Sequence, residues 1–145
     1  MNSQKIDLVG LKKNEISNLI YPICENNNSV NMRVSQLWDW IYTKGETDFT
    51  KMTNMSKGFR DILHEKFFIG RPKIQNKLIS QDGTRKYLLK LHDNNLVETV
   101  FIPDKDRGTL CISSQVGCTL NCSFCFTGTQ GLVRNLSASE IVQQL

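Results

Sequence analysis

Three cysteines lie within eight residues of one another, at Cys118, Cys122 and Cys125. Their spacing, C-x3-C-x2-C, places three thiols on one short loop that begins beside Gly117. Three thiolates can hold three irons of a cubane [4Fe–4S] cluster, which normally has four cysteine ligands. The fourth iron would then stay open to a small molecule. The pattern therefore predicts redox chemistry at an open iron.

Structural zinc is the alternative for these cysteines. Zinc takes four nitrogen or sulfur ligands, and a fourth could come from elsewhere in the chain. The candidates for this fourth ligand are Cys24, His64, His92 and Cys111. Zinc sites usually draw paired cysteines from two separate loops, whereas here three cysteines share one loop. The spacing favours the cluster and leaves zinc open.

A wider set of residues resembles one enzyme family. C-x3-C-x2-C is the signature of the radical S-adenosylmethionine enzymes, and the stretch from Cys111 to Cys125, together with Arg134-Asn135-Leu136, is similar to the RNA adenine-C2 methyltransferases among them. Arg33-Val34-Ser35-Gln36-Leu37 is similar to the helical N-terminal domain of that family, and Val97-Glu98-Thr99-Val100 to its strand region. The resemblance covers nearly the whole chain.

The resemblance implies a radical mechanism and a role for five residues. C2 of adenine is electron-poor, so it does not attack a sulfonium methyl as an ordinary nucleophile. In the family, a 5′-deoxyadenosyl radical takes hydrogen from a methylated cysteine late in the chain, and the carbon radical adds to C2. Cys118, Cys122 and Cys125 match the cluster ligands, Glu98 the proton acceptor, and Cys111 the thiol that resolves the protein–RNA crosslink through a transient disulfide. Without the resemblance, Glu98 is a solvent-facing strand residue and Cys111 a buried small hydrophobe.

The same resemblance implies the cofactors and partners. They are a [4Fe–4S] cluster, S-adenosylmethionine, 23S ribosomal RNA, transfer RNA and an electron donor such as a flavodoxin-type reductant. No apolar run approaches the ~20 residues that cross a bilayer, and the first nine residues have no apolar signal core, so we expect a cytoplasmic protein without a membrane partner. Two alternatives stay open: the related adenine-C8 methylating branch, and a zinc- or cluster-stabilised RNA-binding module without catalysis.

The charge distribution fits an RNA partner. The formal net charge is +4, and residues 51–90 carry ten Lys and Arg against three Asp and Glu. A basic segment attracts a phosphate backbone through charge neutralisation. Lys57, Arg60 and Lys66 are the candidates on an expected helix, although a basic face is also often only a solvated surface.

Helices are expected in the N-terminal half of the chain. Apolar residues recur at helical spacing over residues 11–21, 34–43 and 56–67, with a polar loop expected at 24–29 and a stop at Gly45. These three helices predict a small domain over residues 1–70. Its aromatic residues at helical spacing, Trp38, Trp40, Tyr42 and Phe59, are expected mostly in the core.

Strands are expected after Pro72, over residues 74–80, 86–91, 96–102 and 109–114, with a hairpin turn at Asp82-Gly83. Ser137 and Glu140 have the spacing of a capping box that begins a helix. We therefore expect an α+β fold: a three-helix unit, β-hairpins over 71–107, and, over 108–145, the first βα unit of an incomplete radical-SAM (β/α) barrel. The rest of that barrel and the methyl-bearing cysteine are not in these 145 residues, so we expect no methyltransferase activity from this chain alone.

Overall fold

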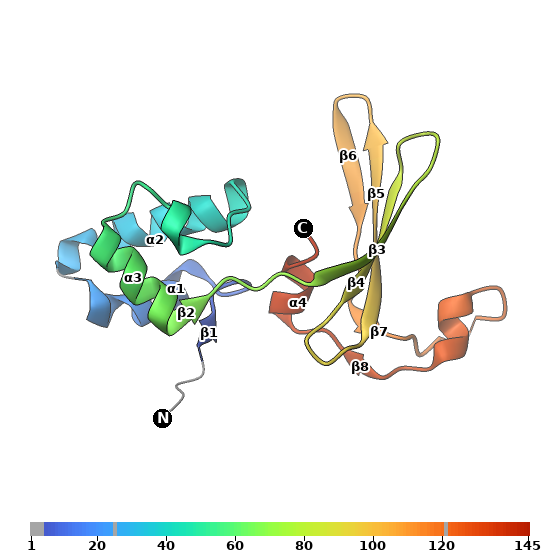
Figure 1. Ribbon diagram of the computed structural model, residues 1–145. Coiled ribbons are helices and arrows are strands. Elements are labelled where there is room, and N and C mark those ends of the chain that lie inside the picture. The colour runs from blue at the N-terminus through green and yellow to red at the C-terminus, as the bar shows by residue number, and fades with distance from the viewer. Residues whose placement is uncertain (1–4, 25, 121) are drawn as a thin grey trace. The chain divides into compact units, whose positions relative to one another are not determined.

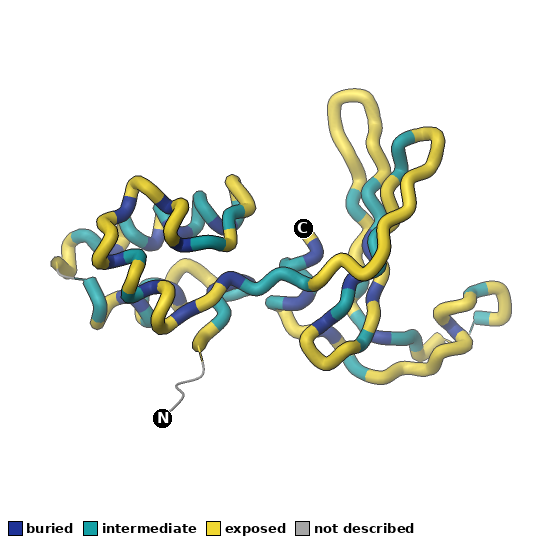
Figure 2. Tube along the Cα trace, in the orientation of Figure 1, coloured by how far each residue is buried: buried dark blue, intermediate teal, exposed yellow. Residues whose placement is uncertain are grey.

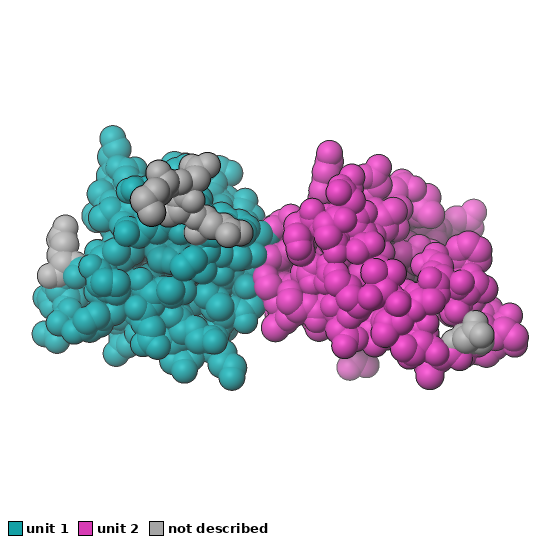
Figure 3. Space-filling view, turned by 90° about the horizontal axis from the view of Figure 1, so that it is seen from below, with its two compact units in different colours: residues 1–70 teal, residues 71–145 magenta. Residues whose placement is uncertain are grey.

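The computed structural model describes residues 5–24, 26–120 and 122–145. The chain forms two compact units, residues 1–70 and residues 71–145 (Figures 1 and 3). The first unit is mainly helical and the second is built on a β-sheet. Together they give the mixed helix and strand content that the sequence predicts.

The first unit packs three helices around one core (Figure 1). The helices are α1 (Lys13–Ile20), α2 (Val30–Trp38), which continues as a π-helical turn (Asp39–Thr43), and α3 (Lys57–Lys66). Each helix contributes buried apolar residues at helical spacing, which is how an amphipathic helix buries one face. The fully buried side chains of this core include Leu8, Ile16, Ile20, Leu37, Ile41, Met52 and Leu63.

The three expected helices are present, and one begins earlier than expected. The loop expected at 24–29 contains a short 3₁₀ turn (Asn27–Ser29) that leads directly into α2, so the helix begins at Val30 rather than at residue 34. The Asn26 side chain accepts a hydrogen bond from the Asn28 amide at 2.9 Å and caps this turn. At the other end, Gly45 has φ +65°, a conformation that favours glycine, and the helix ends before it.

A short parallel pair of strands closes the first unit. β1 (Ile6–Asp7) pairs with β2 (Phe67–Phe68), which directly follows α3. The Asp7 carboxylate accepts hydrogen bonds from the amides of Val9 and Gly70, both at 3.0 Å. The pair therefore ties the beginning of this unit to its end, and the hydrophobic periodicity gave no sign of it.

The second unit contains a four-stranded antiparallel sheet in which every strand pairs with its neighbour in sequence. The strands are β3 (Lys73–Ile79), β4 (Arg85–Lys90), β5 (Leu96–Asp104) and β6 (Arg107–Cys111). The expected turn joins β3 to β4, and Gly83 has φ +84° there. The charged turn between β5 and β6 is tighter than expected, because Asp104 already pairs with Arg107.

The remaining elements follow the sheet in the chain. β7 (Gln115–Val116) pairs antiparallel with β8 (Arg134–Asn135), and α4 (Ala138–Val142) follows. The strand expected over 109–114 ends at Cys111, so β7 is separate from it. Ser137 and Glu140 form the expected capping box. One side of the sheet packs with this region around a small core of Leu89, Leu91, Val97, Val116 and Leu136.

Burial differs along the second unit (Figure 2). Every residue of β3 is exposed, and so is most of the cysteine-bearing loop, whereas the middle of β4 and β5 is partly buried. Among the described residues, none of the helices has both the length and the apolar character that crossing a bilayer requires.

Candidate active site

One face of the second unit's sheet forms the wall of a cleft of about 480 Å³. Both Glu98 and Cys111 line this cleft, and so does Gly117 at the start of the cysteine-bearing loop. Phe126, Thr127 and Gln130 of that loop also line the cleft. Glu98 and Cys111, which the sequence analysis names as candidates on separate strands, therefore line the same cleft.

The strand register explains why Glu98 and Cys111 share a face. Side chains alternate between the two faces of a strand, so Glu98 and Val100 lie on the same side of β5. Val100 pairs directly with Cys111 on β6, and Glu98 pairs with Leu88 on β4. A register that differed by one residue would turn Glu98 to the opposite face.

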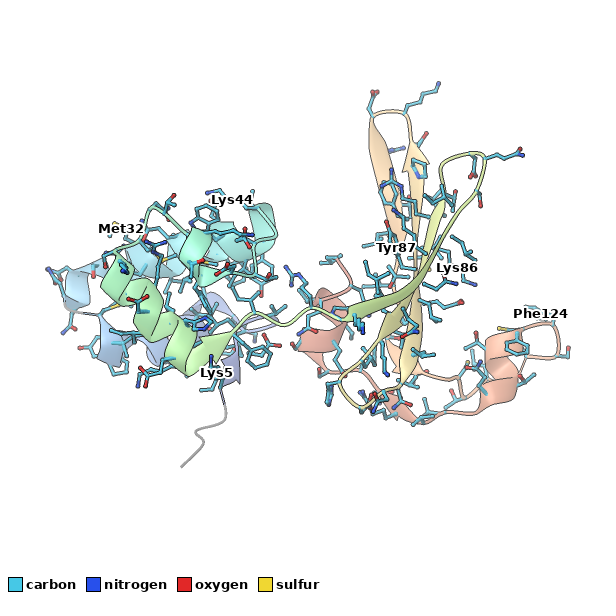
Figure 4. All side chains as sticks on the ribbon, in the orientation of Figure 1. Lys5, Met32, Lys44, Lys86, Tyr87 and Phe124 are labelled. Carbon is cyan, nitrogen blue, oxygen red and sulfur yellow. The ribbon has the colours of Figure 1, made fainter. Side chains whose placement is uncertain are left out.

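The carboxylate of Glu98 is half exposed and forms an ion pair across the sheet. Its Oε1 lies 2.7 Å from Nζ of Lys86, a residue of β4 that also lines the cleft. Lys86 and Tyr87 are consecutive in β4 and project to opposite faces of the sheet (Figure 4). Sequence reasoning did not single out Lys86, because its place on the Glu98 face depends on the pairing of β4 with β5, whereas the predicted Asp-Gly turn lies between β3 and β4.

Cys111 is exposed and has a free thiol. It is the last residue of β6, an edge strand of the sheet. The interpretation of Cys111 as a buried small hydrophobe is therefore wrong. An accessible thiol at the wall of a cleft can react with a partner that enters the cleft.

The cysteine-bearing loop is closed at its base by two glycines. Gly117 has φ +76°, and a Cβ there would collide with the carbonyl oxygen of Gly131. The Cys118 amide donates to this same oxygen at 3.3 Å. The loop therefore leaves and rejoins the β7–β8 pair at one point, and a side chain at Gly117 would open that point.

Cys118, Cys122 and Cys125 are half-buried free thiols. The Cys125 amide donates to the Cys122 carbonyl at 3.1 Å, and the Leu120 amide donates to Sγ of Cys118 at 3.4 Å. Among the residues that the structure describes, no three or more metal-ligating side chains come together. The donor types of the three cysteines fit an iron–sulfur cluster.

The loop also exposes large apolar side chains. Phe124 is 91% exposed and Phe126 is 81% exposed, and Figure 4 shows Phe124 at the far end of the loop. Large aromatic side chains in folded proteins usually pack against other apolar groups.

The other candidate zinc ligands are engaged elsewhere or lie in the first unit. Burial raises the pKa of the Cys24 thiol, with the nearby charge of Arg33 opposing the shift, so this thiol is a poor ligand at neutral pH. Nδ1 of His92 lies 3.3 Å from Oε1 of Glu140. His64, like Cys24, belongs to the first unit.

A partly buried ionic network holds α4 against the β7–β8 pair. Arg134 donates two hydrogen bonds to the carboxylate of Glu140, both at 2.8 Å, and a third to Asp93 at 2.8 Å. The hydrogen bonds from Arg134 outweigh the effect of burial and lower the pKa of Glu140 to about 2. Burial would raise the pKa of Asp93, but hydrogen bonds from Arg134 and Asn95 lower it to about 2.

Acid is expected to destabilise the second unit through this network. Because the pKa of Glu140 is about 2 in the folded protein against an ordinary value of 4.5, stability is full above about pH 4.5 and falls as the pH approaches 2. The loss from Glu140 is of order 3 kcal/mol. Thermal unfolding followed by far-ultraviolet circular dichroism between pH 7 and 2.5 should show it, and a Glu140→Gln variant should be less stable at pH 7 and less sensitive to acid.

The first unit provides an internal control for that measurement. Both tryptophans of the chain, Trp38 and Trp40, lie in it, so their fluorescence reports on a unit without this network. If the thermal unfolding midpoint of the second unit did not change with pH below 4.5, the role assigned to Glu140 would be wrong.

A second polar contact ties α4 to the sheet. The side-chain amide of Gln144 accepts hydrogen bonds from the Thr99 hydroxyl at 2.9 Å and the Ser113 amide at 2.8 Å, and it donates to the Ser113 carbonyl at 2.8 Å. The Ser113 hydroxyl in turn donates to the Glu98 carbonyl at 2.8 Å. Gln144, in the turn that follows α4, therefore links Thr99 on β5 to Ser113 after β6, a role that no local sequence signal indicated.

The basic residues of α3 differ in availability. Lys57 and Lys66 are exposed, whereas Arg60 is partly buried and donates to the Thr50 carbonyl. The expectation that all three are available to phosphate is therefore wrong for Arg60. Of the aromatic residues, Phe59 is buried, while Trp40 is half buried, donates to Asn54 at 2.6 Å and lies under the ammonium of Lys44.

Comparisons with known proteins show what this chain is similar to. Residues 6–69 match the family described as ribosomal RNA large subunit methyltransferase N-terminal domain. The chain is 54% identical over 147 aligned residues to the dual-specificity RNA methyltransferase RlmN of Chelativorans sp. (strain BNC1), and 52% identical over 141 to that of Sphingopyxis alaskensis. These alignments cover 98% and 97% of this chain but 36% and 34% of the relatives.

A solved structure is also similar. The crystal structure of a radical SAM methyltransferase from Sphaerobacter thermophilus matches with a TM-score of 0.82 and 33% sequence identity. The match covers 96% of this chain and 40% of that chain. The chain therefore spans little more than a third of the proteins it resembles.

Proposed function

Because the chain belongs to the RlmN family of RNA methyltransferases as an N-terminal portion, we propose that it provides the RNA-binding domain and the first part of the catalytic core of an enzyme that methylates C2 of adenine in 23S ribosomal RNA and in transfer RNA. Residues 1–70 would be the RNA-binding domain and 71–107 a connecting strand region. Residues 108–145 would begin the (β/α) barrel, in a protein that acts in the cytoplasm.

One observation supports this proposal above the others. Glu98 and Cys111 come from different strands, and the register places both in one cleft that the cysteine-bearing loop borders. A carboxylate and an accessible thiol beside a loop of three cysteines are parts that the radical methylation of an adenine would use, together with a methyl-bearing cysteine from the rest of the enzyme. A zinc-stabilised binding module requires neither the carboxylate nor the accessible thiol.

Each residue would have one task in that reaction. Cys118, Cys122 and Cys125 would hold three irons of a [4Fe–4S] cluster and leave the fourth to S-adenosylmethionine. When bound, the cluster supplies the electron for reductive cleavage of S-adenosylmethionine, delivered by a flavodoxin-type donor. Glu98 would accept the proton from C2 at a carboxylate oxygen. The Cys111 thiol, exposed at the cleft wall, would form the transient disulfide that releases the product.

A hybrid enzyme tests the proposal. In it, residues 1–145 of this chain are followed by the remaining part of the Chelativorans relative, and that relative is the positive control. After anaerobic reconstitution with iron and sulfide, we expect a labelled methyl group from S-adenosylmethionine to appear as 2-methyladenosine in both RNAs, measured by mass spectrometry. A cluster-loaded hybrid that forms 8-methyladenosine, or no methyladenosine, would refute the assignment. Zinc bound without acid-labile sulfide would favour the binding module.

The first unit is expected to bind RNA through exposed lysines of α3. Replacing Lys57 and Lys66 by Glu should weaken binding of transfer RNA by about tenfold near 0.1 M salt, and the slope of log affinity against log salt should fall by about 1 for each phosphate that is no longer neutralised. Fluorescence anisotropy over a salt series measures both quantities, and the two single variants show which lysine contributes.

A matched variant controls for net charge. Lys105, exposed in the turn between β5 and β6, becomes Glu with the same change of two charge units as each single α3 variant. Binding by this variant should stay close to that of the unmodified chain. Equal losses for Lys105 and α3 variants would mean that overall charge, rather than α3, determines the affinity.

A further inference from the structure

We infer that Lys86 is a positioning residue for Glu98: its ammonium holds the carboxylate in the orientation in which it meets the adenine. The inference rests on the proposed function, because it assigns a task within the same reaction. It starts from the ion pair of 2.7 Å between Lys86 Nζ and Glu98 Oε1 on the wall of the cleft.

The backbone of Glu98 is fixed on both sides. Its neighbours Val97 and Thr99 are 4% and 2% exposed, and they anchor β5 from the opposite face of the sheet. The Ser113 hydroxyl donates to the Glu98 carbonyl at 2.8 Å. The position of the Glu98 Cα is therefore well determined before any substrate arrives.

The side chain of Glu98 has no such constraint without Lys86. A glutamate can rotate about three side-chain bonds, and in the described part of the chain Lys86 is the ionic partner of this carboxylate. Lys86 pairs with Val100, which lies two residues beyond Glu98 on the same face, so the two charged side chains are diagonal neighbours across β4 and β5. The lysine thus reaches the carboxylate from the wall of the cleft and leaves the open side free.

The small free energy expected from the Lys86–Glu98 ion pair argues against a role in stability. The two side chains are 45% and 49% exposed, and an exposed ion pair contributes about 0–1 kcal/mol to folding. When an RNA base covers the cleft and excludes water, the same attraction strengthens because the local dielectric falls. The ammonium also offsets the repulsion between the carboxylate and the approaching phosphates.

Turnover of the hybrid enzyme separates positioning from binding. In Lys86→Met, we expect kcat to fall about 10- to 100-fold while KM for RNA changes less than about threefold, since misplacing a reacting group costs rate rather than affinity. Lys86→Arg keeps a cation within reach of the carboxylate and should recover most of the rate. In the isolated chain, Lys86→Met should leave the unfolding midpoint within about 2 °C of the unmodified protein.

Lys77→Met is the matched control. Lys77 lies on the adjacent strand β3, but it pairs with Tyr87, and its ammonium lies over that ring at 5.5 Å, on the opposite face of the sheet. This variant should retain the full rate. A rise in KM without a fall in kcat for Lys86→Met would overturn the inference in favour of a phosphate contact, and an unchanged kcat would overturn it outright. A cluster-loaded hybrid without activity would instead remove the proposed function, and the inference with it.

Discussion

Replacing Cys122 by Ser in the hybrid enzyme is expected to reduce methyl transfer to below detection. A cluster held by three thiolates loses one ligand, and a serine hydroxyl is not ionised at neutral pH as a cluster-bound thiol is. The variant should also lose the visible absorbance of the cluster and most of its iron and acid-labile sulfide. Mass spectrometry of the digested RNA and iron and sulfide analysis of the protein measure these losses.

Cys24→Ser is the control for that experiment. Cys24 is also a half-buried free thiol, but it lies in the first unit and has no assigned task. This variant should keep its iron and its activity. If Cys122→Ser retained iron, sulfide and turnover, the assignment of the loop as the cluster site would be wrong.

Replacing Glu98 by Gln should lower kcat of the hybrid by about 10²- to 10⁴-fold, the usual contribution of general acid–base catalysis. Glutamine has nearly the shape of glutamate, and its amide oxygen can still accept a hydrogen bond from Lys86. The substitution therefore removes proton acceptance and leaves most of the geometry. KM for RNA and cluster content should stay close to those of the unmodified hybrid.

Glu65→Gln provides the comparison for Glu98→Gln. Glu65 is exposed on α3 of the first unit, loses the same charge and is not among the residues that line the cleft. Its activity should match that of the unmodified hybrid. A rate for Glu98→Gln within threefold of this control would exclude Glu98 as the proton acceptor.

The strands of the sheet that carries Glu98 could be predicted because the sequence signals for each strand and turn lie within a few residues of one another. Alternating apolar residues mark the strands, and the turn at Asp82-Gly83 sets the pairing of β3 with β4. The face shared by Lys86 and Glu98 depends instead on the pairing of β4 with β5, which that turn does not set. The capping box of Ser137 and Glu140 could also be predicted from the sequence, because it depends only on a spacing of three residues.

Contacts between distant parts of the chain could not be predicted in this way. β1 pairs with β2 across about sixty residues, and Gln144 reaches Thr99 across forty-five. Neither contact is indicated by a hydrophobic periodicity or by a turn motif in the sequence. The early start of α2 has a different cause: a polar 3₁₀ turn leads into the helix, and the apolar pattern begins only after it.

The cysteine-bearing loop shows a further limit. Sequence spacing supplies the donor types, whereas the path of the loop in space decides how close the donors come to one another. The described residues accordingly show three half-buried thiols that do not form a ligand set. The types of donor could be predicted here, and their geometry could not.

The sequential pairing of β3, β4, β5 and β6 has a consequence for the order of assembly during synthesis. Every strand pairs with the strand next to it in sequence, so all the pairing is local and closes only short loops. Such a sheet can form as the chain leaves the ribosome, before later segments exist. The wall that holds Glu98 and Cys111 would then be complete first and serve as a template for the cysteine-bearing loop.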